Sequence, residues 1–252
     1  MEHLEIFLYR RAKRVVSVTH SFRNDLLRRG IRPEKIVVVT NGVDIQRFHP
    51  QPRDASLAEI LGLQGRFVAG YIGTHGMAHG LETLLETAQQ LRKDPEGKDI
   101  RLLFLGDGAY KAKLVAQAEE MGLDNVVFVD SVSKKEVVRY WSLLDVSIIH
   151  LKKTRLFTTV IPSKLFECMG MGVPVLHGVA GESAQIVETE GCGLLFEPEN
   201  AEALRVGLLT LKTKPSLLGT YRQKAIDAAH RYDRRVLAQT MLREIEALCP
   251  GR

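Results

Sequence analysis

Short runs of apolar, mostly β-branched residues alternate along the chain with longer stretches in which apolar positions recur every three to four residues. The short runs predict buried strands and the longer stretches predict amphipathic helices. The clearest helix is predicted at Leu81–Arg92, where Leu84, Leu85, Ala88 and Leu91 fall on one face. We therefore expect an α/β fold, with a doubly wound, Rossmann-like parallel sheet covered by helices on both faces.

The predicted elements are spread along the whole chain. Strands are expected at Arg14–Val18, Lys35–Thr40, Phe67–Ile72, Arg101–Leu105, Asn125–Val129, Val146–His150, Pro174–His177 and Gly193–Phe196. Further helices are expected at Tyr110–Met121, Lys134–Leu144, Ser163–Gly170, Glu182–Glu188 and Ala201–Leu211, and over roughly the last 35 residues.

The alternation of strands and helices is interrupted at Asn41–Leu57, where turn residues and prolines accumulate. Two predicted strands and one helix precede this break, too few to form a sheet buried on both faces. A complete six-stranded unit follows it. We therefore predict one whole domain at residues 48–230, preceded by the end of another domain at 1–47 and followed by a helical segment at 231–252.

Composition and charge narrow the class of protein. Hydrophobic residues make up 45% and charged residues 26%, which favours a globular protein. The net charge of +5 suits an anionic partner such as a nucleotide, a lipid pyrophosphate or a membrane surface, and scattered surface charges explain it equally well. Since no basic patch is interleaved with aromatic residues, we expect no binding of nucleic acid.

Other features of the chain bear on its location. The apolar runs are far shorter than the roughly 20 residues that span a bilayer. The first residues place acid before base, the reverse of a signal peptide, so we expect a cytoplasmic protein. Cys168, Cys192 and Cys249 are widely spaced and odd in number, which fits neither a disulfide framework nor a zinc site.

Two glycine-containing loops follow predicted strands at the edge where such folds bind ligands. The loop Gly70–Gly80 opens the clearest helix, and its glycines would let the backbone approach a diphosphate closely. Its spacing matches neither the dinucleotide fingerprint nor the P-loop, and a purely structural turn is an equal alternative. For the tight turn Leu105–Gly108 a structural role is favoured.

A third loop, Ile161–Val175, carries more specific chemistry. Ser163 is predicted to start a helix in which Lys164 and Glu167 lie one turn apart. One interpretation is a capping arrangement in which Glu167 serves the helix start. The other is that the lysine holds a phosphate and the glutamate holds a ribose diol.

Several motifs in order resemble a known family: NGVD, the glycine loop before LETLLETA, LLFLGDG, VVFVDSV and PSKLFECMGMGVPVL. Together they resemble the C-terminal, donor-binding half of family 4 (group 1) glycosyltransferases of the GT-B fold, from about Arg14 to Glu197. The PSKLFE form is closest to the branch of bacterial surface-polysaccharide enzymes that includes the WbuB-like proteins. The resemblance implies a nucleotide-sugar donor, retention of the anomeric configuration, no cofactor and no metal ion. The sequence contains no Asp-x-Asp metal motif.

The resemblance assigns roles to particular residues. Glu167 matches the second glutamate of the family's E-x7-E motif, which binds the ribose hydroxyls, whereas the first falls at Thr159 and is absent. The usual diphosphate-binding arginine and lysine fall at Thr74 and His79. Lys164 is therefore our candidate to replace these cations and to offset charge on the leaving diphosphate.

The resemblance also assigns roles to residues by their position relative to the family's motifs. Glu182 begins the helix after a strand whose loop lies against the donor in the family, so it is expected either to contact sugar hydroxyls or to favour its own helix dipole. Ser131 and Val132 fall at the place of base recognition, which works through backbone and leaves uracil and guanine open. The nucleotide-binding candidates are Gly73, Thr74, His75, Gly76, His79, Ser131, Val132, Ser163, Lys164 and Glu167, and the catalytic candidates are Lys164 and Glu182.

The resemblance also implies partners. In the GT-B fold the acceptor domain comes first, and here residues 1–47 match only its end, while 231–252 match the helix that crosses back to it. We expect a UDP-linked donor, a lipid-linked saccharide acceptor, an N-terminal domain or separate subunit, and peripheral contact with the inner face of the plasma membrane. The alternative is a nucleotide-sugar-binding module without turnover of its own.

Overall fold

A computed structural model describes residues 2–248. Within this range the strands are β1 Val15–Ser17, β2 Ile36–Val38, β3 Phe67–Ile72, β4 Ile100–Leu105, β5 Val126–Val129, β6 Val146–His150, β7 Val175–Gly178 and β8 Gly193–Leu195. The α-helices are α1 Glu2–Arg11, α2 His20–Arg28, α3 Ala55–Ile60, α4 Glu82–Lys93, α5 Lys111–Glu120, α6 Val137–Trp141, α7 Lys164–Met171, α8 Glu182–Glu190, α9 Ala201–Thr213, α10 Pro215–Ala229 and α11 Arg234–Glu246. Short 3-10 turns are η1 Pro33–Lys35, η2 Met77–His79, η3 Phe157–Thr159 and η4 His230–Tyr232.

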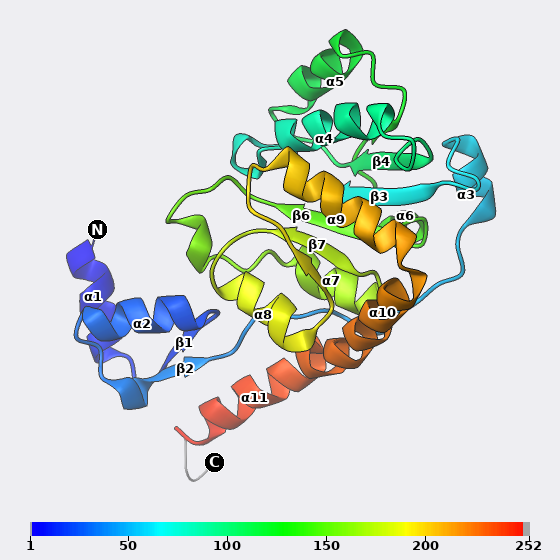
Figure 1. The fold of residues 1–252 in the computed structure, drawn as a ribbon. Coiled ribbons are helices and arrows are strands. Elements are labelled where there is room, and N and C mark those ends of the chain that lie inside the picture. Colours follow the sequence, from blue (N-terminus) through cyan, green and yellow to red (C-terminus); the bar gives the residue numbers. More distant parts are fainter. Residues whose placement is uncertain (1, 249–252) are drawn as a thin grey trace.

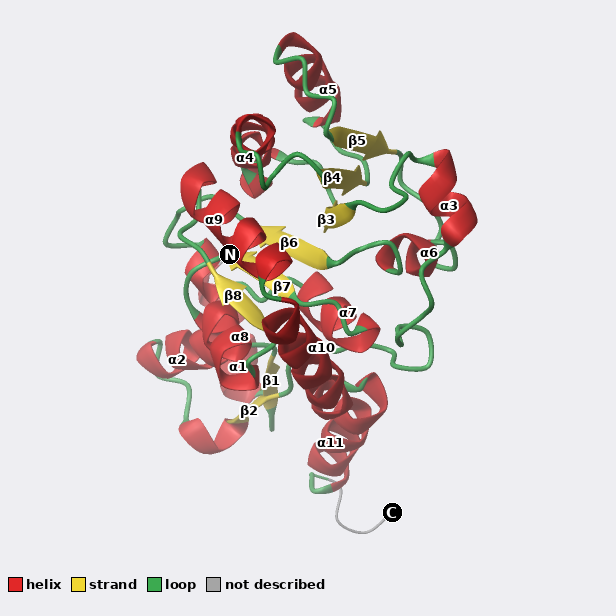
Figure 2. Ribbon diagram, turned by 45° about the vertical axis from the view of Figure 1, so that its right-hand side comes forward, coloured by secondary structure: helices red, strands yellow, loops and turns green. Residues whose placement is uncertain are grey.

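The described residues contain a six-stranded parallel sheet in the order β5-β4-β3-β6-β7-β8. The chain runs outward from β3 to β5 and then returns past β3 to build β6, β7 and β8. Helices cover both faces, with α4, α5 and α9 on one side and α3, α6, α7 and α10 on the other (Figures 1 and 2). The predicted doubly wound parallel sheet is confirmed.

The central strands are largely apolar because both of their faces are buried. In β3, Val68 and Ile72 pack into the cluster with α7 and α10, whereas Ala69 and Tyr71 pack into the cluster with α4 and α9. This division follows from the two-residue period of a strand. The carboxyl ends of β3, β4, β6 and β7 therefore lie together at one edge of the sheet.

The predicted elements differ from the structure in a few places. Helix α1 has no counterpart among the predicted elements, and α3 begins inside the break at Asn41–Leu57 and extends beyond it. The helix expected at Lys134–Leu144 is shorter in the structure, where α6 follows a turn in which Ser133 and Glu136 hydrogen-bond each other. The capping interpretation of Ser163 is wrong: this residue has helical φ and ψ of −59° and −30°, and its side chain makes no capping bond.

The N-terminal segment forms a small lobe beside the main sheet (Figure 1). Strands β1 and β2 pair in parallel, and Val15, Leu26, Ile31 and Ile36 form a small apolar cluster with α2. The chain joins the main domain near Val43, whose backbone bonds Tyr232 and Arg234.

Helix α11 runs back along this lobe, and Arg14 pairs with Glu244 at 3.1 Å. The last residues of the segment predicted at 231–252, including Cys249, lie outside the described residues. Cys168 and Cys192 are buried free thiols. No helix among residues 2–248 is long and apolar enough to cross a membrane.

Candidate functional site

A pocket of about 380 Å³ opens at the carboxyl ends of β3 and β6, against the start of α7. This is the edge at which open parallel sheets bind ligands. The pocket brings together six of the predicted residues, from two separate parts of the chain, the glycine loop after β3 and the start of α7. Its lining consists of Ile72, Gly73, Thr74, His79, Ile149, His150, Leu151, Val160, Pro162, Ser163, Lys164 and Glu167.

The turn after β4 packs against the glycine loop that follows β3 and accepts hydrogen bonds from its backbone. The backbone N–H of Gly73 donates to Leu105 and that of His75 donates to Asp107, at 2.9 and 2.8 Å. A Cβ at Gly106 would lie 1.9 Å from the Gly73 carbonyl oxygen, so only glycine fits there. The turn at 105–108 therefore has the structural role that the sequence favoured.

Lys164 places a desolvated amine at the wall of the pocket. Its Nζ is buried and has no hydrogen-bond partner among the described residues. It lies 3.9 Å from the centre of the Tyr71 ring, and a Cβ at Gly73 would approach it to 2.6 Å. Burial lowers the pKa of this amine to about 8. An unpaired buried cation is costly, and an anionic ligand in the pocket would satisfy it.

Tyr71 is a site residue that the sequence analysis missed. Its ring lies against the Lys164 amine, and its hydroxyl donates to the Thr74 carbonyl oxygen at 2.8 Å. It thus connects the amine with the glycine loop. The sequence offers only an aromatic residue within a buried strand, and the packing of α7 on the sheet decides that this ring meets Lys164.

Glu167 lies one turn beyond Lys164 and lines the same pocket. Burial raises the pKa of its carboxyl group, while the positive charge of Lys164 opposes the shift. A carboxylate and an amine therefore face one cavity from a single helix turn. This pair offers an acceptor for hydroxyl groups and a donor for an oxyanion.

The two histidines of the glycine loop have different surroundings. His75 is fully buried, does not line the pocket, and has no hydrogen-bond partner for either ring nitrogen within the described part of the chain. His79 lines the pocket and meets Tyr71 edge to face. Burial, together with the Lys164 charge for His79, lowers the pKa of both to about 4. Both are therefore neutral near pH 7 and supply no permanent cation.

His150 ties two loops together at the rim. Its Nε2 accepts from the Glu199 N–H at 2.8 Å, so Nδ1 carries the proton and donates to the His79 carbonyl oxygen at 2.7 Å. The ring stacks on Phe196. These contacts give His150 a packing role at the rim of the pocket.

Several predicted residues do not line this pocket. Gly76, Ser131 and Val132 are not among its lining residues. The Glu182 carboxylate accepts from the backbone N–H groups of His20 and Ser21, at 2.7 and 2.8 Å. In this arrangement it faces α2 and not the pocket, and the roles of these residues in the donor site stay predictions.

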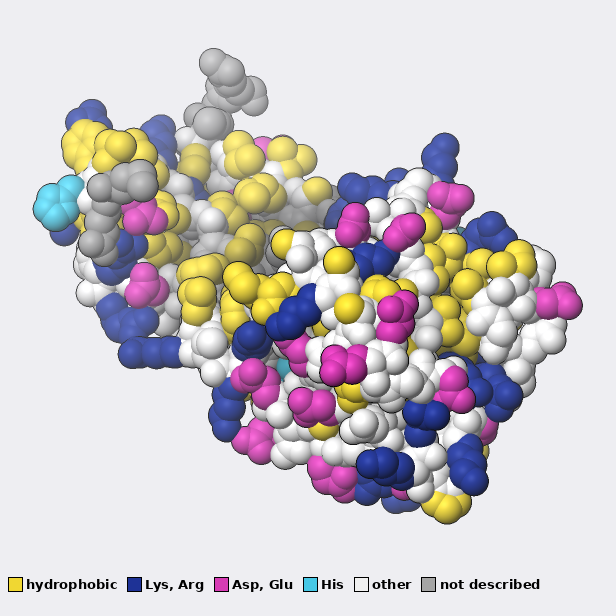
Figure 3. Space-filling view, turned by 90° about the horizontal axis from the view of Figure 1, so that it is seen from above, with side chains coloured by type: hydrophobic (Ala, Val, Ile, Leu, Met, Phe, Trp, Pro, Cys, Tyr) yellow, Lys and Arg dark blue, Asp and Glu magenta, His cyan; other side chains and the backbone are white. Residues whose placement is uncertain are grey.

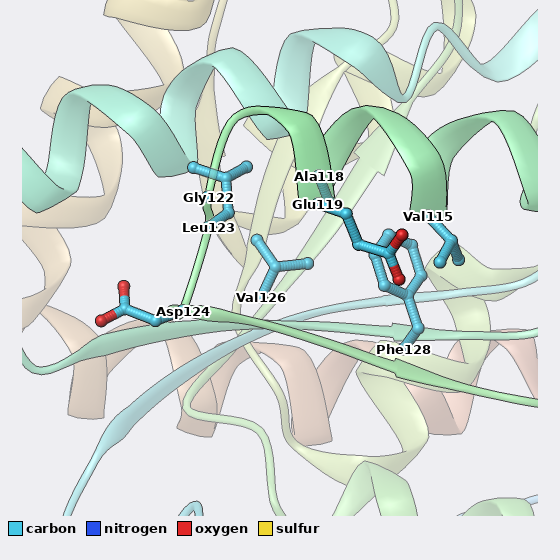
Figure 4. Close-up of a pocket in the computed structure, with 8 residues that line it drawn as sticks. All are labelled: Val115, Ala118, Glu119, Gly122, Leu123, Asp124, Val126 and Phe128. Atoms are coloured by element: carbon cyan, nitrogen blue, oxygen red, sulfur yellow. The ribbon is translucent and has the colours of Figure 1, made fainter.

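Another groove, of about 470 Å³, lies between α5 and the edge strand β5 (Figure 4). It contains none of the predicted residues and is lined by Val115, Ala118, Glu119, Gly122, Leu123, Asp124, Val126 and Phe128. Among the described residues, no group of three or more His, Cys, Asp or Glu side chains is arranged to hold a metal ion.

The fold and the pocket at the carboxyl edge of its sheet define a Rossmann-like α/β protein. The family model described as "Glycosyl transferases group 1" matches residues 55–231, and that described as "Glycosyltransferase Family 4" matches residues 1–47. The chain belongs to the group 1 glycosyltransferase family.

Curated relatives agree with this family. The putative colanic acid biosynthesis glycosyl transferase WcaI of Escherichia coli K12 is 27% identical over 84% of this chain and 53% of its own length. The putative teichuronic acid biosynthesis glycosyltransferase TuaH of Bacillus subtilis is 30% identical over 57% of this chain and 34% of its own. The chain spans about half the length of the curated relatives it matches, or less.

Solved structures show the same fold. Anabaena HepE in complex with UDP and glucose matches with a TM-score of 0.83 and 21% identity, over 97% of this chain and 66% of that one. WaaG, a glycosyltransferase involved in lipopolysaccharide biosynthesis, matches with a TM-score of 0.72 and 19% identity, over 90% and 60%. These neighbours are GT-B glycosyltransferases, of which the chain covers a part.

Proposed function

We propose that this chain is the donor-binding half of a retaining glycosyltransferase that uses a UDP-linked sugar in polysaccharide or glycolipid synthesis. The observation that carries the proposal is the unpaired, buried Lys164 amine between the Gly73 loop and Glu167 in one pocket. The names of the colanic acid and teichuronic acid relatives support the class of product. The UDP complex of HepE supports the donor.

In this proposal the nucleotide is held by a few polar groups. Glu167 accepts hydrogen bonds from the ribose hydroxyls, and Lys164 donates to the diphosphate. The backbone of Gly73 and Thr74 approaches the phosphates, which the absence of a side chain at Gly73 permits. His79, neutral near pH 7, offers a single N–H.

The proposed role of Lys164 in transfer is electrostatic. Negative charge grows on the leaving diphosphate as the bond to the sugar breaks, and a preorganised ammonium stabilises that charge in the transition state. Because this chain's own cation would supply the charge, we propose that no metal ion is required. Sugar transfer that persists in excess EDTA would support this mechanism, and transfer restored only by Mg²⁺ or Mn²⁺ would contradict it.

The acceptor site is proposed to lie on a half that is represented here only by residues 1–47. That half is either a preceding domain or a separate subunit, and it would bind a lipid-linked saccharide at the inner face of the plasma membrane. We also propose that this chain belongs to the WbuB-like branch of the family and that it works in the cytoplasm. The net charge of +5 supports contact with an anionic surface.

A nucleotide-sugar-binding module without turnover is the second candidate, because the chain spans only about half of its curated relatives. Calorimetric titration with UDP, GDP and ADP sugars tests the binding that both candidates share. Tightest binding of a UDP sugar is expected, and no binding of any nucleotide sugar would overturn both. Turnover after addition of an acceptor half separates the two.

A further inference from the structure

The start of helix α2 is completed by a residue that lies 162 positions away in sequence. The Glu182 carboxylate accepts from the N–H groups of His20 and Ser21, and the Thr19 side chain accepts from Phe22 at 3.0 Å. All three N–H groups of the first helical turn are therefore satisfied. Unsatisfied N–H groups at a helix start are costly, so this arrangement stabilises α2.

The charge of Glu182 also fits this position. The first turn of α2 carries no acidic residue of its own, although the positive end of a helix dipole favours a negative charge there. Glu182 is 9% exposed and Thr19 is 2% exposed, which keeps these bonds out of water. A carboxylate with two N–H donors is thus buried between two different parts of the fold.

These two parts belong to different lobes. Helix α2 lies in the small N-terminal lobe, and α8 follows β7 of the main sheet (Figure 1). The other polar contacts described between the lobes lie near the crossing at Val43 and Arg234, and at the Arg14–Glu244 ion pair. The Glu182 contact joins the lobes on the side that faces the carboxyl edge of the sheet.

The same contact is close to the wall of the donor pocket. Gly181 has a φ of +91°, and a Cβ there would lie 2.0 Å from the Thr158 carbonyl oxygen. The turn η3 therefore packs directly on the residue that precedes Glu182. Val160 and Pro162, just beyond that turn, line the pocket.

We propose that Glu182 is a positioning residue, a latch that holds the first turn of α2 against the start of α8. It fixes the N-terminal lobe, which carries the end of the acceptor half, beside the donor pocket. The N-terminal lobe then moves about the crossing at Val43, and it can swing away from α8 when the two hydrogen bonds to Glu182 break. This inference concerns lobe geometry and stands independently of the nucleotide assigned to the pocket.

Amide hydrogen exchange tests the latch directly. Glu182→Ala should speed exchange at His20 and Ser21 by about tenfold or more, because both N–H groups lose a charge-assisted acceptor. Glu182→Gln keeps the shape and one acceptor oxygen, and should give a smaller increase. Glu188→Gln, on the exposed side of the same helix, is the matched control and should leave both amides as in the wild type.

A second variant separates the latch from the local cap. Thr19→Ala removes the acceptor for Phe22 and should speed exchange mainly at that amide. Unchanged exchange at His20 and Ser21 in folded Glu182→Gln and Glu182→Ala would overturn the proposal. Protection of β4 amides reports whether each variant is folded.

Lobe movement is measured with spin labels at two exposed positions, Asn24 on α2 and Gln185 on α8. The wild type should give one narrow distance distribution, and Glu182→Gln should broaden it or shift it to longer distances. A distribution that stays narrow and unchanged in the variant would show that Glu182 only caps a helix, and would also overturn the latch.

Discussion

At the scale of single residues, the Lys164 amine is the most informative group in the structure. It has left water without gaining a hydrogen-bond partner within residues 2–248, and the Tyr71 ring lies against it. A ring face offsets part of the loss of hydration but supplies no hydrogen-bond acceptor. A diphosphate would supply both acceptors and charge.

Replacing Lys164 by methionine tests the diphosphate contact. The variant keeps most of the side-chain volume and removes the ammonium, so UDP binding should weaken by about 1.5–3 kcal/mol. Binding of uridine, which has no phosphate, should change little. Titration calorimetry with both ligands gives the comparison, and equal losses for UDP and uridine would mean that Lys164 is structural.

The same amine predicts how UDP affinity depends on pH. Its pKa in the free protein is about 8, and a bound diphosphate favours the charged form and raises that pKa. Affinity should therefore be constant below about pH 8 and fall as the pH rises above it, up to the pKa of the complex. The decline should be absent from Lys164→Met. A flat profile in the wild type would contradict the assignment.

Glu167→Ala tests the ribose contact. A carboxylate that accepts from two hydroxyl groups should contribute about 1.5–3 kcal/mol, so both UDP and uridine should bind more weakly. This pattern differs from the one expected for Lys164, whose loss spares uridine. Glu188→Gln serves as a charge control on an exposed surface. Unchanged UDP affinity in a folded variant would remove Glu167 from the site.

At the scale of elements, several histidines are buried at the carboxyl edge of the sheet. His177 follows the same rule as the glycine-loop histidines: its Nε2 and the Ser183 hydroxyl are 2.9 Å apart, and burial lowers its pKa to about 3. Each of these rings is neutral when folded, whereas an unfolded histidine has a pKa of about 6.5. At a pH between the folded and the unfolded pKa of such a histidine, the unfolded chain therefore binds more protons than the folded chain.

This difference predicts a loss of stability in acid. Since the folded pKa of His75 is about 4, its contribution is complete above about pH 6.5 and is lost as the pH falls toward 4. The free energy of unfolding should drop by on the order of 1–2 kcal/mol per buried histidine between about pH 7 and 5. Urea unfolding at several pH values measures the drop.

Variants show which histidines are responsible. His177→Asn should flatten part of the pH dependence, whereas His3→Asn, at an exposed position, should not alter it. A urea midpoint that is constant between about pH 7 and 5 in the wild type would show that these rings do not control acid stability.

At the scale of the whole molecule, the small lobe presents an incomplete surface. Leu4, Phe7 and Leu8 of α1 are 62%, 52% and 57% exposed, and Val16 and Val18 beside them are also exposed. Hydrophobic side chains gather over this lobe on the left of Figure 3. Exposed apolar patches of this kind mark interaction surfaces, and the two-stranded sheet leaves open edges.

We therefore expect the chain alone to bind donor without transferring sugar. Transfer needs donor and acceptor in one geometry, and a misplacement of even an ångström costs on the order of a hundredfold in rate. Supplying the acceptor half, fused or co-expressed, should restore turnover and reduce aggregation together. UDP release is measured with and without that half in the presence of a lipid-pyrophosphate extract. Robust acceptor-dependent turnover by the 252-residue chain alone would refute this expectation.

The sequence by itself predicted the strands and helices of the main sheet and the loops at its ligand edge. It also placed Gly73, Lys164 and Glu167 at one edge of the predicted sheet. Such features depend on the spacing of hydrophobic residues and on neighbours within a few positions, which can be seen in the sequence itself. The family resemblance added the nucleotide-sugar donor that these residues are predicted to bind.

Tertiary structure alone decided the remaining features. It placed the Tyr71 ring under the Lys164 amine, buried His75 without a partner in the described part of the chain, and turned Glu182 toward His20. These features depend on elements that are far apart in the sequence, and the spacing of hydrophobic residues along the chain does not show which distant elements meet. Their positions follow from how the helices pack on the sheet and where the N-terminal lobe docks, and a helix start accepts a carboxylate from any part of the chain that reaches it.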